Sequence, residues 1–246
     1  MKKFKEFVIA ILIIAAVGAL IYFMYERGSS KTNRDLAKRM AEISPRGGPP
    51  ETIEGLRQAI TLYENQIERN VREGAQTGVY WKILGTRLAD RGMHNDALSA
   101  FERAIYFNTE DPSLYYLTGV SAGFVAKSKI GFSPRESEHY FKLAENAHLR
   151  ALELEITYTR PMYALAILYA FELDRPQDAI IQLERYMQIL PSDISAMFVL
   201  ARAYFMIENN SRAIELYDRI ISRTRNQEER QEASANKDLI MGMLYE

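Results

Sequence analysis

The chain has 246 residues, 31 basic against 32 acidic side chains, and no cysteine. The lack of cysteine excludes disulfides, thiolate metal sites, thiol catalysis and the lipid attachment of a bacterial lipoprotein. Basic and acidic residues are interspersed, which argues against a nucleic-acid surface, because such a surface needs a concentrated basic stripe. No run of alternating apolar and polar residues is long enough to predict a sheet, so we expect an all-α fold.

The N-terminus carries the signature of a membrane anchor. Residues 7–25 contain no charge, and their nineteen residues are close to the number that crosses a bilayer core. Three lysines lie among residues 1–6, so the positive-inside rule places this end in the cytoplasm and the rest of the chain on the far side. A cleaved signal peptide is the alternative, because Ala16-Val17-Gly18 resembles a cleavage site. The apolar run continues beyond that site, which favours an uncleaved transmembrane signal anchor.

Residues 26–50 are expected to form a linker, since the stretch SPRGGPP at 44–50 breaks any helix. The next segment, 51–76, shows apolar residues at helical spacing. We expect it to be an N-terminal capping helix or half repeat of the domain that follows.

A repeated pattern fills residues 77–225. Its first occurrence predicts two helices. In the first helix, a large residue, a Leu-Gly pair and another large residue share one face (Trp81, Leu84, Gly85 and Leu88), and Gly92 closes that helix. In the second helix, small and aromatic residues follow at spacings of four and three: Ala97, Phe101 and Ala104. These residues resemble the tetratricopeptide repeat (TPR), a helix–turn–helix unit of about 34 residues. The alanine of the second helix recurs at Ala97, Ala144, Ala179 and Ala213, which lie 47, 35 and 34 residues apart.

The resemblance implies an α-solenoid of antiparallel helix pairs and a binding scaffold. The spacing predicts repeats over 77–111, 112–158, 159–193 and 194–225, followed by a C-terminal capping helix over 226–246.

The long first interval predicts an insertion in the second repeat. Its first helix is expected to begin at Pro112 with Asp111 as cap, and its second at Pro134 with a capping box of Ser133 and Glu136. The resulting hairpin projects beyond its neighbours and exposes Ile130 and Phe132 as a possible docking element. A tolerated insertion on a surface loop remains the alternative.

The resemblance also implies that the first helices line a concave groove. In the first repeat the groove positions are Lys82, Thr86 and Asp90. In the later repeats they are mostly apolar or aromatic: Tyr116, Val120, Phe124, Tyr163, Ile167, Phe171, Phe198, Arg202, Phe205 and Met206. Thr86 stands where chaperone-binding members of the family have asparagine, so we expect no clamp for a C-terminal carboxylate.

An apolar groove of this size is expected to be covered. Three occupants are open: the chain's own C-terminal helix or residues 31–50, a helix or extended peptide of a partner, or a small apolar ligand.

Nothing in the sequence predicts catalysis. The three histidines are scattered, and no HExxH, GxSxG or P-loop pattern is present, so we expect no enzyme, cofactor or metal site. The sequence predicts a scaffold held in the bacterial inner membrane, with its repeats in the periplasm and with partners in a secretion, cell-wall or motility assembly, and a homo-oligomer is possible. The alternatives are a ligand-binding or transporter-associated periplasmic module and a structural subunit of a ring or collar.

Overall fold

The computed structural model describes residues 34–45 and 48–245, and the side chains among them up to residue 243. The predicted cytoplasmic start and the segment 7–25 lie outside the described residues. Among the residues that are described, no helix combines the length and the apolar character needed to cross a membrane. The chain divides into two compact units, Met1–Glu73 and Gly74–Glu246.

In the first unit, a helix over residues 34–43 pairs with the first half of α2 (Ile53–Asp90). A Pro- and Gly-rich loop joins them and comes close to α2, because a Cβ placed on Gly55 would lie 2.9 Å from Cβ of Pro50. The helix α2 continues from this unit into the second one. The boundary expected after residue 76 therefore falls inside a single helix.

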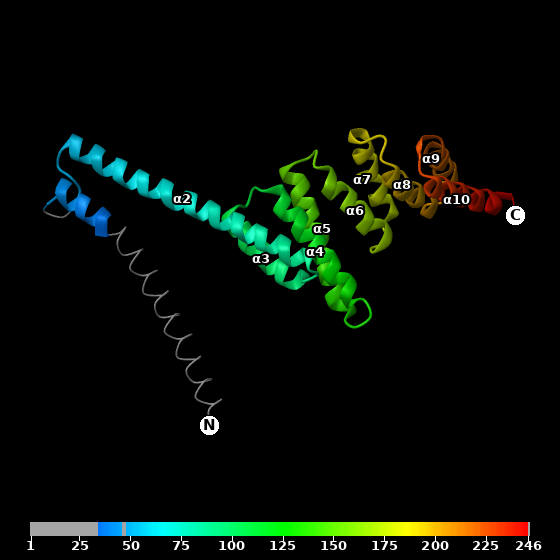
Figure 1. The fold of residues 1–246 in the computed structure, drawn as a ribbon, viewed down its shortest axis with the longest axis horizontal. Coiled ribbons are helices and arrows are strands. Elements are labelled where there is room, and N and C mark those ends of the chain that lie inside the picture. Colours follow the sequence, from blue (N-terminus) through cyan, green and yellow to red (C-terminus); the bar gives the residue numbers. More distant parts are fainter. Residues whose placement is uncertain (1–33, 46–47, 246) are drawn as a thin grey trace, which may run out of the picture. The chain divides into compact units, whose positions relative to one another are not determined.

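The second unit stacks helices in sequence order (Figure 1). After the end of α2 follow α3 (His94–Phe107), α4 (Pro112–Lys129), α5 (Pro134–Leu154), α6 (Thr159–Phe171), α7 (Pro176–Ile189), α8 (Ile194–Met206), α9 (Asn210–Arg223) and α10 (Gln227–Tyr245). The strongest contacts join α4 to α5, α6 to α7 and α8 to α9, and neighbouring first helices touch as well, α4 with α6 and α6 with α8. This is the predicted all-α solenoid of helix pairs.

Small residues at the repeat positions make the close helix contacts. Ala97, Ala144, Ala179 and Ala213 are all at most 1% exposed. A Cβ on Gly85 would lie 2.5 Å from the ring of Phe101, so this glycine is required for the contact between α2 and α3. Gly92 has φ +75°, the left-handed conformation that ends a helix and that glycine adopts without strain.

The pair α4–α5 forms the predicted long hairpin, with 18 and 21 residues against 13 and 14 in each of the next two pairs. Asp111 caps α4 as expected, accepting a hydrogen bond from the Ser113 amide at 2.9 Å. The capping box expected for α5 is wrong: the Ser133 side chain makes no capping bond, and Glu136 instead pairs with Lys129 at 2.9 Å. Near the hairpin tip, Ile130 and Phe132 are exposed, Phe132 by 92%.

Candidate functional site

The groove residues expected from the repeat register lie on the first helices α4, α6 and α8. They fall into equivalent sets one repeat apart, the first being Tyr116, Tyr163 and Phe198, the second Val120, Ile167 and Arg202, and the third Phe124, Phe171 and Met206. Phe124, Phe171 and Arg202 are exposed, whereas the other six and Phe205 are half-buried.

The first set packs inward against the second helices. The ring of Tyr116 lies 5.8 Å from that of His148 on α5. Likewise Tyr163 lies 5.5 Å from Tyr186 on α7, and Phe198 meets Tyr217 on α9 at 6.1 Å in an edge-to-face contact. Substituting these aromatic residues would therefore disturb helix packing along with any binding surface.

The exposed aromatic residues of the third set are flanked by polar groups. Phe124 stacks on the imidazole of His94, with ring centroids 4.4 Å apart and planes nearly parallel. The guanidinium of Arg202 lies 4.8 Å from the ring centroid of Phe171. Both rings are thus held in place while part of their surface stays accessible, the arrangement expected of preformed contact residues.

An apolar cavity of about 230 Å³ opens between α4 and α6. Its walls include Val120, Phe124 and Ile167, and its floor is made by Phe141 and His148 of α5. At its edge an ion pair joins Lys127 and Glu172 at 2.6 Å. Typical small-ligand pockets measure about 300–1,000 Å³, so this cavity is better suited to one inserted side chain than to a whole ligand.

The floor residue His148 is only 3% exposed, and its Nδ1 atom has no hydrogen-bond partner. Burial lowers the pKa of its imidazole to about 4, so the ring is neutral near pH 7. It lies against α4 at Gly119, where a Cβ would come within 2.5 Å of the ring. The sequence did not predict this floor, because it comes from a second helix, and the only signal was the small residue at Gly119 opposite it.

The groove positions of the first repeat line a separate cavity of about 540 Å³, together with Asp111. Lys82 is already engaged there, since its Nζ lies 2.7 Å from Oδ2 of Asp111 and also donates to Ser113. Burial by itself raises the pKa of the Asp111 carboxyl, but the hydrogen bonds from Lys82 and Ser113 hold it below its ordinary value. The charge of Lys82 is thus already balanced by that of Asp111.

The C-terminal helix has its own packing site. It lies against α9, with Ala233 and Ile240 buried there at 0% and 2% exposure. The buried side chains Ala233 and Ile240 therefore pack α10 against α9, at the end of the solenoid. Within the described ranges, no group of three or more His, Asp or Glu residues is placed to hold a metal ion.

No family model matches the chain, and no curated protein matches it. Solved structures do match. The crystal structure of MamA is 20% identical, covers 72% of this chain and 90% of its own, and has a TM-score of 0.53. A MamA segment from Desulfovibrio magneticus RS-1 is 15% identical, covers 69% and 96%, and reaches 0.54. A weaker match, with a TM-score of 0.36, is YrrB, described as a TPR protein with an unusual peptide-binding site (17% identical, covering 68% and 97%).

The fold is a TPR-like α-solenoid. At these identities the likeness concerns the fold alone. Stacked helix pairs of this kind create an extended concave surface.

Proposed function

We propose that the chain is a non-catalytic scaffold that binds another protein through the apolar surface of α4 and α6. The observation that carries this proposal is the cavity between these helices, which has Phe124, 54% exposed, in its wall. An apolar ring held in place at an open cavity is suited to an apolar side chain presented by a helix or an extended segment of a partner.

The proposed location is the periplasmic face of a bacterial inner membrane, with residues 7–25 as anchor and an envelope protein as partner. Its support is the uncharged run and the lysines before it. Fusing alkaline phosphatase, which is active only outside the cytoplasm, to the C-terminus tests this topology. Active fusions are expected, and inactive fusions of a stably expressed chain would contradict the proposed location.

The binding surface is tested by photo-crosslinking in cells from an unnatural residue at position 124. Position 181 provides the matched control, since Ile181 is 53% exposed but lies on the second helix α7. We expect an adduct to another protein from position 124 and none to that protein from position 181. Adducts within this chain only, or the same adducts from both positions, would overturn the proposal.

Phe124→Glu then measures the contribution of the groove. The charge would lie in the path of an apolar side chain, so the crosslinked partner should no longer copurify, whereas Ile181→Glu should retain it. Phe198 is a poorer choice for this test, because its ring packs against Tyr217 and its loss would also loosen the fold.

A further inference from the structure

The first half of α2 carries a row of large apolar side chains that the described residues leave exposed. Their spacing alternates between three and four residues, the a and d pattern of a coiled coil. They are Ile53, Leu56, Ile60, Tyr63 and Ile67, with exposures of 74, 41, 55, 51 and 60%. We call these five residues the α2 seam. It ends where the next core position is taken by Asn70.

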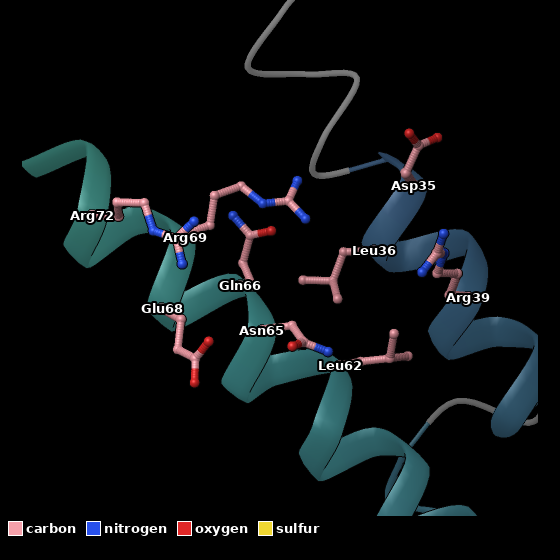
Figure 2. A pocket seen from close by; sticks show the side chains of 9 residues that line it. All are labelled: Asp35, Leu36, Arg39, Leu62, Asn65, Gln66, Glu68, Arg69 and Arg72. Atoms are coloured by element: carbon pink, nitrogen blue, oxygen red, sulfur yellow. The ribbon is translucent and has the colours of Figure 1, made fainter.

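The helix over residues 34–43 covers the neighbouring face of α2 and leaves the seam open. Leu36 and Leu62 point toward each other between the two helices, with polar side chains such as Asn65 and Arg69 around them (Figure 2). On α2, Gly55 and Ala59 are buried beside this contact, Ala59 at 6% exposure. The partner helix therefore lies beside the seam, on the side of Ala59 and Leu62.

Between the two helices an apolar groove of about 910 Å³ runs along the seam. One wall is formed by four seam residues and the other by Ala37, Met40 and Ala41. Small alanines on that wall leave room for the close approach of another helix. The groove is thus shaped for one more amphipathic helix laid against α2.

We propose that the seam of a second copy of this chain fills this groove, with the two α2 helices antiparallel. The argument is charge complementarity at the edge of the seam, where Arg57 and Glu64 occupy equivalent heptad positions. When Ile60 faces Tyr63 of an antiparallel copy, each Arg57 comes opposite a Glu64 of the other chain. Neither side chain makes an ion pair within the described part of the chain, so both are available. A parallel pair would instead place Arg57 beside Thr52 and Glu64 beside Ala59, without any ion pair.

The other edge of the seam carries Ala59 and Gln66, so no like charges meet there in the antiparallel pair. From residue 53 to residue 67 the seam measures only about 21 Å, at 1.5 Å per residue. An interface of this length belongs to the small class, and we expect a dimer that dissociates on dilution.

The absence of cysteine makes disulfide trapping a direct test. Full-length chains carrying Leu56→Cys and full-length chains carrying Ile67→Cys, with different tags, are coexpressed and mildly oxidised. The antiparallel pair places position 56 next to position 67 of the other copy, and leaves the two copies of position 56 about 16 Å apart. We therefore expect mixed disulfides, which join a Leu56→Cys chain to an Ile67→Cys chain, and few disulfides between two chains with the same substitution. Gln58→Cys, on the opposite side of the helix, is the control and should give none.

Charge reversal tests the ion pairs. Arg57→Glu and Glu64→Arg each bring like charges together and should lower the yield of mixed disulfide several-fold at low salt, whereas the double reversal should restore it. Disulfides mainly between two chains that carry the same cysteine substitution would overturn the antiparallel pair. So would a yield of mixed disulfide that the charge reversals leave unchanged. No disulfide at all would overturn self-association, as expected if another protein or residues 1–33 cover the seam. Circular dichroism should show unchanged helix content, because these side chains are exposed.

Discussion

Two glycines of α4 lie four residues apart and have opposite surroundings. A Cβ on Gly119 would meet the His148 ring at 2.5 Å, whereas a Cβ on Gly123 would meet nothing within 4 Å. Alanine gains about 1 kcal/mol over glycine inside a helix, but overpacking a buried contact costs about 1–3 kcal/mol.

Gly119→Ala should therefore lower the free energy of unfolding by up to about 2 kcal/mol, and Gly123→Ala should leave it unchanged or raise it by up to about 1 kcal/mol. Urea denaturation of the two variants measures the difference. Equal stabilities would mean that the His148 ring can move aside without cost.

The buried imidazole of His148 makes stability depend on pH. Its pKa is about 4 in the folded chain, below the ordinary 6.5 that applies to the unfolded chain. Between these values the unfolded state binds a proton that the folded state does not bind. The contribution of His148 is thus complete above pH 6.5 and is lost progressively as the pH falls toward 4, by on the order of 3 kcal/mol in total.

Urea denaturation at pH 7, 5.5 and 4.5 measures this loss. The carboxyl groups also titrate near the lower end, so His148→Gln provides the baseline. The wild type should lose more stability than the variant between pH 7 and 4.5. Parallel pH profiles would show that the ring is protonated, or reaches water, in the folded chain.

At the scale of the element, local signals predicted several helix starts and stops. Asp111 with Pro112 begins α4, Pro134 begins α5, and Gly92 closes the turn after α2. These features depend on neighbouring residues only, which is why sequence reasoning reaches them. The capping box expected at Ser133 does not form, because Glu136 pairs instead with Lys129 on the other side of the turn. Local sequence signals do not reveal such a competing partner.

The continuity of α2 is the feature that the pattern did not reveal. The repeat register begins at residue 77, which favoured a boundary just before it, yet no proline lies between residues 51 and 111 to stop a helix. Gly74 and Gly78 weaken the helix by only about 1 kcal/mol each. The spacing of the seam predicted an apolar helix face, but spacing alone does not tell which partner covers such a face, and the five seam residues are exposed.

At the scale of the whole molecule, the solenoid was predictable because each repeat contacts only its neighbours, and the same residues recur at each contact. The candidate site was predictable only in part. Positions such as Phe124 and Ile167 follow from the register, but the cavity between them depends on how α4 and α6 sit over Phe141 of another helix. The depth of this cavity depends on tertiary packing, which the spacing of the repeats does not predict.

Because each repeat contacts only its neighbours, a destabilising substitution at one end of the solenoid should affect only the helices next to it. On α10, Ile240 is 2% exposed and the adjacent Leu239 is 57% exposed. Ile240→Asp would bury a carboxylate against α9 without a partner, so α10 should detach and stop covering that helix. Leu239→Asp carries the same charge on the same turn and should leave the packing intact.

Hydrogen exchange followed by mass spectrometry reads the outcome helix by helix. In Ile240→Asp, amides of α9 and α10 should lose about 2–4 kcal/mol of protection, the amount expected for a buried aliphatic residue, while α3 to α5 keep theirs. In Leu239→Asp all helices should match the wild type. Equal loss of protection from α3 to α10 would instead show that the solenoid unfolds as one cooperative unit, and that its two ends are coupled over the whole stack.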